Sequence, residues 1–377
     1  MRRRRHIEQT LTCDSKTTMR LLLPLLTFLN TYNITTFAYT NCKPTSPLTT
    51  TQATPLELAQ ALVGVGVEIV AGSVTFTGFP ITSQHSMVAK FAGGSTLFQN
   101  NDDMDTGIVL TTGDVNQPLC RPQGTIDSYD WSGGNTETID IDLINICKTF
   151  YTSKSLDSSA CNQYEDQAKL EFKFKITARA KMGIKYSFAS EEWPDFVENL
   201  YADGFAFFID GENIALTPQG QGVSIGSINC KKFTGAHSCE NCKLYTNNGG
   251  GVDATCPNAV ATTPDNEQKI SYNAYTHVLR GERILNAGEH TIKMVVADQR
   301  DGMYDSAVFI AAKSLVAPNP ICYTVTQIGQ CSTTTGFQET AVQPVEVFPQ
   351  GHPVLTRTDC DGAPGALFLH YCFCLYH

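Results

Sequence analysis

The sequence predicts a mainly β protein, a β-sandwich of the jelly-roll type with one short N-terminal helix and a disulfide-rich insert. Residues 170–177, LEFKFKIT, alternate apolar with polar side chains, as a strand with one buried face does. Residues 204–209, GFAFFI, are continuously apolar or small, which indicates a strand covered on both faces. The 29 Gly and 20 Phe, together with many Thr and Val, also favour strands over a helical bundle.

The one predicted helix lies near the start of this domain. Thr54 is a suitable N-cap, Pro55 occupies the first helical position, and Glu57 completes a capping box. Gly64 is expected to end the helix. The side chains expected to face the core are Leu58, Leu62 and Val63.

The remaining predicted elements are short strands separated by turn residues, a pattern typical of an antiparallel sandwich. Two strand pairs, in residues 186–211 and 292–310, each enclose an acidic loop. A turn at residues 286–288 joins the two strands of a hairpin. The predicted strands cover residues 67–77, 107–112, 138–146, 170–177, 186–190, 204–209, 213–216, 222–228, 276–284 and 289–298.

The chain divides into a signal region at 1–38, a Thr- and Pro-rich lead-in at 39–53, a sandwich domain at 54–316, and a Cys-containing tail or partial second module at 317–377. The run LLLPLLTFL behind Met19 is too short to span a bilayer and is typical of a secretory signal, with cleavage expected near Ala38. Translation from Met19 is an alternative start, and a retained membrane anchor would need a longer apolar run. We therefore predict a secreted or cell-surface protein with no transmembrane span in the mature chain.

The formal net charge of −10 argues against nucleic acid as a partner, because phosphate binding needs a basic surface. An acidic surface otherwise indicates solubility, and a calcium-rich extracellular setting is the alternative explanation.

Four cysteines, Cys230, Cys239, Cys242 and Cys256, lie close together in a Gly- and Asn-rich segment. A Cys-x-x-Cys spacing occurs in tetrahedral zinc sites, but the other spacings here are uneven. Disulfides are favoured instead, since an exported protein meets an oxidising compartment. We predict two disulfides among these four cysteines, which staple a long loop.

The two acidic loops predict a metal site. If both emerge at the same end of the sandwich, their carboxylates converge and raise one another's pKa. Calcium would relieve that repulsion, because it accepts roughly six to eight oxygen ligands in irregular geometry, whereas magnesium demands an octahedron. The alternative is that these side chains cap turns by accepting backbone N–H groups. The predicted ligands are Glu191, Glu192, Asp203, Asp298, Asp301 and Asp305.

Five blocks of sequence stand in the order found in the choice-of-anchor L domain family: ATPLELAQALVG, GIVLTTGD, FASEEWPDF, DGFAFFIDGENIAL and VVADQRDGMYDSAVFI. The chain resembles that family over residues 53–316. The resemblance implies a secreted or surface-displayed β-rich module engaged in adhesion or binding rather than in catalysis. The insert at residues 230–256 is a departure from the family pattern, as is the lack of a clear anchor sequence.

A narrower likeness suggests the ligand. Residues 202–208, ADGFAFF, are similar to a strand of legume-type lectins, in which the matching Asp bonds sugar hydroxyls. We therefore predict that Asp203, with Glu191 and Trp193, contacts an extracellular ligand, a glycan or a protein.

The alternative function is a carbohydrate-active hydrolase on a similar sandwich, with an acid/base pair drawn from Glu191, Glu192 and Asp298. Residues 222–226, GVSIG, match the G-x-S-x-G motif of esterases, but no helix is expected to follow the Ser. His277 and His290 are expected on strand surfaces. An adhesion or recognition module, not an enzyme, is the favoured prediction.

Overall fold

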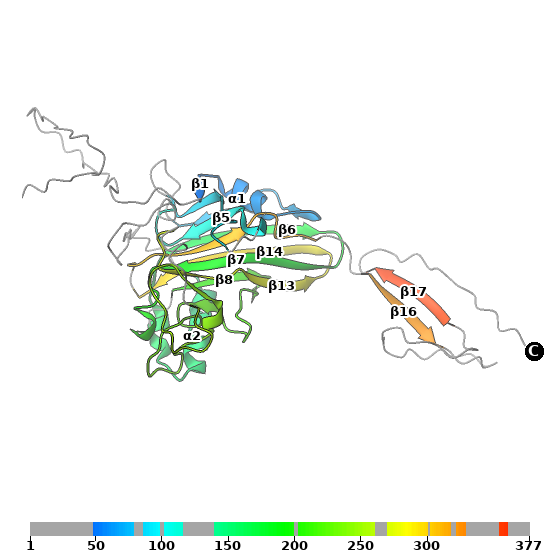
Figure 1. Ribbon diagram of the computed structural model, residues 1–377. Helices are drawn as coiled ribbons and strands as arrows, with labels where there is room; N and C mark the ends of the chain where they lie inside the picture. The colour runs from blue at the N-terminus through cyan, green and yellow to red at the C-terminus, as the bar shows by residue number, and fades with distance from the viewer. Residues whose placement is uncertain are drawn as a thin grey trace, which may run out of the picture.

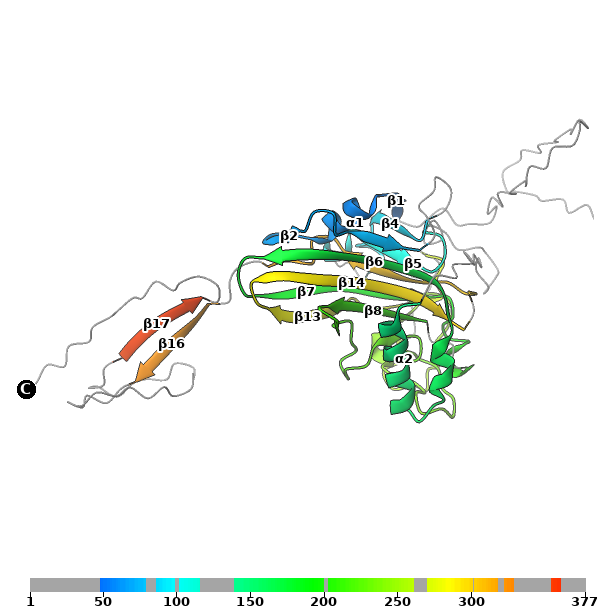
Figure 2. The ribbon, with the colours of Figure 1, turned by 180° about the vertical axis from the view of Figure 1, so that it is seen from behind.

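The structure is a computed structural model that describes residues 48–78, 86–98, 102–115, 139–199, 203–260, 270–300, 302–317, 322–328 and 354–360. Its fold is mostly β, as the sequence predicts: two antiparallel sheets face each other (Figures 1 and 2). A further pair of strands, β16 (Cys322–Ile328) and β17 (Val354–Cys360), forms its own two-stranded sheet.

The first sheet has eight strands. Its order is β1 (Thr49–Thr51), β4 (Val88–Ala92), β5 (Thr106–Thr111), β15 (Ser306–Ala311), β7 (Ala180–Ser190), β12 (Ala274–Thr276) and β11 (Tyr245–Asn247), with β13 (Leu279–Leu285) also paired to β7.

The second sheet has seven strands. Its order is β10 (Val223–Ser224), β8 (Gly204–Ile209), β14 (Gly288–Gln299), β6 (Tyr164–Ile176) and β2 (Val67–Ile69), with β3 (Thr75–Thr77) paired to β6 and β9 (Glu212–Asn213) paired to β8.

The main core lies between the two sheets and follows the predicted alternation. Leu170, Phe172 and Phe174 of β6 are fully buried, while the intervening Lys173 and Lys175 are exposed. Strand β8 is buried along its whole length, as its continuously apolar sequence indicates. Burial of each large apolar side chain stabilises the fold by roughly 1.5–3 kcal/mol.

Helix α1 (Pro55–Leu62) confirms the predicted helix. Thr54 accepts a hydrogen bond from the Glu57 N–H, and the Glu57 carboxylate accepts one from the Thr54 N–H at 2.8 Å. Leu58 and Leu62 are buried, and Val63, the C-cap, packs partly buried against the core.

The strand predicted at residues 138–146 is wrong, because helix α2 (Ile141–Ser153) occupies this place. Asp140 caps the helix by accepting a hydrogen bond from the Asp142 N–H. The buried residues Leu143, Cys147, Phe150 and Tyr151 recur at helical rather than strand spacing. They pack with Phe208 and Val295 in a separate cluster outside the main core.

Several strand boundaries also differ from the prediction. The segment 67–77 forms two short strands, β2 and β3, both paired with β6. The segments predicted at 213–216 and 222–228 contain only β9 and β10, of two residues each. Strands β1, β4 and β11 were not predicted.

Candidate binding site

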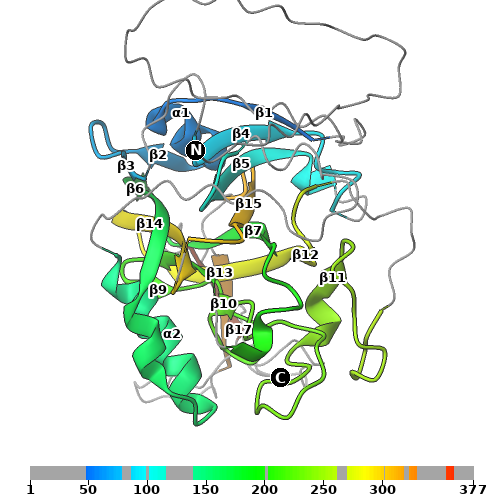
Figure 3. The same cartoon turned by 90° about the vertical axis from the view of Figure 1, so that its left-hand side faces the viewer.

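The two acidic loops lie at the same end of the sandwich, the end that faces the viewer in Figure 3. One loop leads from β7 to β8 and the other from β14 to β15, so each crosses from one sheet to the other. The strand registers place Ser306 opposite Ser190 in the first sheet and Ala297 opposite Gly204 in the second. The condition on which the metal-site prediction rested, a common end for both loops, is therefore met.

Asp203 joins the two loops. Its Oδ1 accepts a hydrogen bond of 2.8 Å from the Gln299 N–H, and its Oδ2 accepts one of 2.8 Å from the Ser306 hydroxyl. The Glu191 N–H donates to the Asp305 carbonyl at 3.0 Å. The alternative that these acidic side chains accept backbone N–H groups therefore holds for one oxygen of Asp203, its Oδ1.

The carboxyl groups at this end are buried together. The pKa of Asp203 is raised to about 7, chiefly by burial, although its hydrogen bonds from Gln299 and Ser306 act to lower it. The pKa of Asp298 is raised well above its ordinary value by burial, and next by the charges of Asp203 and Asp305. Near neutral pH this end therefore holds protons that exposed carboxyl groups would release. Its members, each at most 1% exposed, are Glu191, Glu192, Asp203, Asp298 and Asp305, and we call them the carboxyl cluster.

The carboxyl cluster includes every predicted metal ligand except Asp301, which lies outside the described residues. Within the described part of the chain, however, no group of three or more His, Cys, Asp or Glu side chains has the geometry of a metal site. In the arrangement described here, both oxygens of Asp203 already accept hydrogen bonds, from Gln299 and from Ser306.

Trp193, which the sequence predicts as a ligand contact, lies inside the protein. The side chain is fully buried, its Nε1–H donates to the Ile225 carbonyl at 3.2 Å, and its ring packs edge-on against Phe188 and Tyr245. An aromatic ring enclosed in this way presents no face to a ligand. Asp203 and Glu191, at most 1% exposed, are likewise covered by protein.

The four cysteines of the insert pair with one another, as Cys230–Cys242 and Cys239–Cys256. A further disulfide, Cys147–Cys161, ties α2 to the short 3-10 helix η3 (Ser158–Asn162) and was not predicted.

Of the residues weighed for catalysis, Ser224 and His290 lie in strands, whereas His277 does not. Ser224 lies in β10 with its hydroxyl 3.3 Å from that of Ser227, and residues 225–228 form no helix. His290 lies on β14, where its Nδ1 is 2.7 Å from the Asp210 carboxylate. His277 follows β12, and burial lowers its pKa.

A groove of about 600 Å³ lies between α2 and residues 211–222. Ile146, Phe150, Phe208 and Leu216 supply its apolar lining. Gly222 permits the close approach of the two walls, since a Cβ at this position would lie 2.2 Å from Cγ2 of Ile146. Its polar lining includes Asn145, Thr149, Asn213, Gln219 and Gln221. We call this feature the α2 groove.

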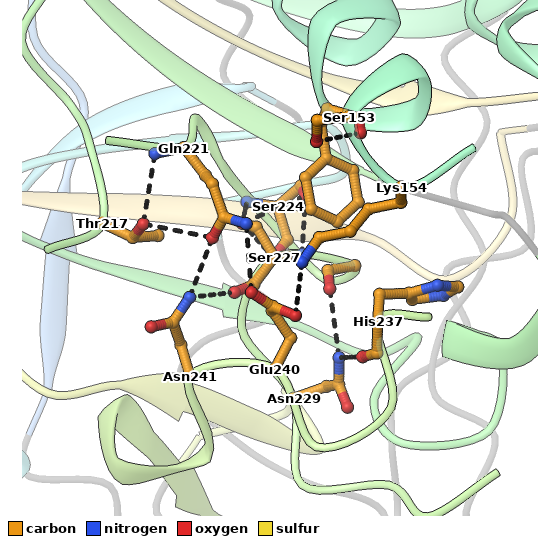
Figure 4. A network of polar contacts seen from close by, with 12 residues as sticks. Ser153, Lys154, Thr217, Gln221, Ser224, Ser227, Asn229, His237, Glu240 and Asn241 are labelled. Atoms are coloured by element: carbon orange, nitrogen blue, oxygen red, sulfur yellow. Dashed lines mark hydrogen bonds and ion pairs between the residues drawn. The ribbon is translucent and has the colours of Figure 1, made fainter. Parts of the chain in front are cut away.

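A network of polar contacts holds the wall of the α2 groove that carries Gln221 (Figure 4). The Gln221 Nε2 donates to Glu240 at 3.0 Å, and its Oε1 accepts from Asn241 at 3.0 Å. Glu240 also pairs with Lys154 at 2.7 Å, next to the end of α2. Glu240 and Asn241 lie between Cys239 and Cys242, so the two disulfides of the insert support this wall.

The sequence prediction missed the α2 groove because it placed a strand where α2 lies. The available signal was the spacing of Asn145, Thr149 and Ser153, which are four residues apart and therefore share one helix face.

Two antiparallel sheets with disulfide-supported surface segments define a disulfide-stapled β-sandwich module. The chain belongs to the choice-of-anchor L domain family, whose model matches residues 47–316, most of the chain. This confirms the resemblance noted in the sequence and indicates a surface-associated extracellular module. No curated protein and no solved structure matches the chain. Among the described residues, no helix is both long and apolar enough to cross a bilayer.

Proposed function

We propose that this protein is a secreted or cell-surface adhesion and recognition module that binds an extracellular ligand, a glycan or a protein, and whose carboxyl cluster takes up calcium. The convergence of two inter-sheet loops on one buried acidic end carries the proposal. Carboxyl groups with strongly shifted pKa values are concentrated at functional sites. Family membership supports the extracellular setting, where free calcium is abundant enough to fill weak sites.

Calcium fits the chemistry of the carboxyl cluster better than magnesium does. Ionised together, Glu192, Asp203 and Asp298 would repel one another in a medium that screens charge poorly. A calcium ion offsets that repulsion and accepts carboxylates in irregular geometry. Binding requires the cluster to release its protons and the side chains to turn toward a common point, so calcium affinity should rise with pH.

Addition of millimolar calcium at pH 8 is expected to raise the melting temperature of the purified protein, because the ion binds the folded chain. At free calcium of about 100 times the dissociation constant, the gain is about 2.7 kcal/mol. Asp298→Asn should remove most of this rise. Differential scanning calorimetry with calcium, with magnesium and with chelator provides the measurement.

The matched control is Glu289→Gln, which changes a carboxylate that is exposed on β14 and pairs with Lys173 and Lys175. This variant should retain the full calcium response. A wild-type melting temperature unchanged by calcium at pH 8 would leave the carboxyl cluster as a purely structural feature.

A carbohydrate-active hydrolase is the second candidate, with an acid/base pair drawn from Glu191, Glu192 and Asp298, because burial raises the pKa of Asp298, as suits a general acid. A glycan array with and without calcium, followed by an assay for reducing ends on any glycan bound, separates the two functions. Retention without new reducing ends supports recognition, and release of reducing ends supports hydrolysis.

A further inference from the structure

The geometry points to the α2 groove as the place where this protein binds an uncharged oligosaccharide. This inference rests on the proposed recognition function and gives it a site and a ligand class. No residue of the carboxyl cluster lines the groove, so the two sites are tested separately. A volume of about 600 Å³ falls within the range of roughly 300–1,000 Å³ that is usual for ligand pockets.

The charges around the α2 groove favour an uncharged ligand. Its two carboxylates are already paired: Asp142 lies 2.5 Å from the Lys293 ammonium, and Glu212 lies 2.9 Å from the Arg283 guanidinium. No Lys or Arg is among the lining residues. A sulfated, phosphorylated or uronic-acid-rich chain would meet these two carboxylates, and the cations beside them, Lys293 and Arg283, are already engaged by them.

The polar side chains of the α2 groove suit hydroxyl groups. Asn145, Thr149 and Gln219 are exposed, on opposite walls. The amides of Asn145 and Gln219 can donate and accept hydrogen bonds, while the Thr149 hydroxyl, which donates to the Asn145 carbonyl at 2.8 Å, can accept them. The Gln221 amide is oriented by Glu240 and Asn241, and its NH₂ group carries a second N–H beyond the one donated to Glu240. Sugar hydroxyls also donate and accept hydrogen bonds, so neighbouring hydroxyls of one sugar can bond to these side chains.

The apolar lining suits the carbon face of a sugar ring. Leu216 is 38% exposed and Ile146 is half-buried between the polar walls. A pyranose ring has C–H groups on its faces and hydroxyls around its edge, so it can place the former on this lining and the latter against the walls.

The walls of the α2 groove are held in place before any ligand arrives. Cys147–Cys161 secures α2, and Cys230–Cys242 with Cys239–Cys256 secures the segment that orients Gln221. Because a fixed site loses little conformational entropy on binding, this arrangement favours affinity for a flexible glycan.

The test is isothermal titration of the purified, disulfide-intact protein with defined hexasaccharides: cello-, manno-, malto- and chitohexaose as uncharged probes, and a heparin-derived hexasaccharide as the anionic probe. We expect at least one uncharged probe to bind and the anionic one not to bind. Thr149→Trp should fill the groove and abolish binding, while Gln219→Ala should weaken it by roughly tenfold through loss of one hydrogen-bonding group.

The matched control is Thr152→Trp, which places the same bulk on the same helix at an exposed position that does not line the groove. This variant should bind as the wild type does, and all variants should keep the wild-type calcium response. Absence of a calcium response together with intact glycan binding would contradict calcium uptake by the carboxyl cluster but not glycan binding in the α2 groove.

The inference is overturned if no uncharged probe binds, if only the heparin fragment binds, or if Thr149→Trp and Gln219→Ala bind as tightly as the wild type. A glycoprotein ligand that is retained equally well after enzymatic removal of its glycans would indicate a protein ligand and would also overturn it.

Discussion

Between pH 4 and pH 8, the contribution of Asp203 to the free energy of unfolding of the calcium-free protein is expected to fall by on the order of 4 kcal/mol. Asp203 has a pKa of about 7 in the folded state, against 3.8 for an unperturbed Asp. A group whose pKa is raised by folding stabilises the fold fully below the lower pKa, and this stability is lost as pH rises through the higher one. The loss of the Asp203 contribution should therefore begin near pH 4 and be nearly complete by pH 8.

Asp298→Asn should flatten this pH dependence, because it removes a second carboxyl group whose pKa burial raises. Urea denaturation at a series of pH values, with chelator and without reductant, measures the effect. The control Asp195→Asn alters an exposed carboxylate of the same loop and should leave the profile unchanged. A wild-type stability that increased from pH 4 to pH 8 would contradict the burial of protonated carboxyl groups at this end.

Stability below pH 4 is governed by other groups. The pKa of Asp140 is lowered by its hydrogen bond and ion pair with Lys293, against the opposing effect of burial. Such a group stabilises the fold above its unfolded pKa, and this contribution is lost as pH falls through the lower folded value. Maximum stability of the calcium-free protein is therefore expected close to pH 4–5.

Trp193→Ala is expected to destabilise the fold by roughly 3–5 kcal/mol, because it empties the space of a fully buried indole. The substitution also leaves the Ile225 carbonyl without the Nε1–H that it accepts. Because Trp193 lies in the loop that carries Glu191 and Glu192, the cavity would also disturb the carboxyl cluster. Urea denaturation at pH 5 gives the change in stability.

Trp193→Phe provides the comparison, since it keeps an aromatic ring between Phe188 and Tyr245 but lacks the N–H. Its loss of stability should be clearly smaller than that of Trp193→Ala. If Trp193→Ala instead removed ligand binding while leaving stability within about 0.5 kcal/mol of the wild type, Trp193 would be a surface contact after all.

The elements predicted well are those whose pattern is local and repeated. Strand β6 alternates along residues 170–176, and α1 carries its cap, its first-turn Pro and its capping-box Glu within four residues. In both cases the periodicity and the end signals agree, so no tertiary contact is needed to choose between helix and strand.

Helix α2 was not predicted because residues 138–146 present mixed signals. Ile139, Ile141 and Leu143 alternate with Asp140 and Asp142, which suggests a strand. The helical spacing becomes clear only when Cys147, Phe150 and Tyr151 are included. Burial of that longer face against Phe208 and Val295 on the second sheet then favours the helix.

The sequence by itself determined the β-sandwich class, the family, the disulfides of the insert and the identity of the acidic residues. Only the tertiary structure decided where the acidic residues lie, how deeply they are buried and how their pKa values shift. Two loops about 100 residues apart meet because β7 and β15 pair in one sheet, while β8 and β14 pair in the other. Burial at that meeting point raises the pKa values of Asp203 and Asp298 and encloses Trp193. Burial depends on which strands become neighbours, and a local sequence pattern does not specify that.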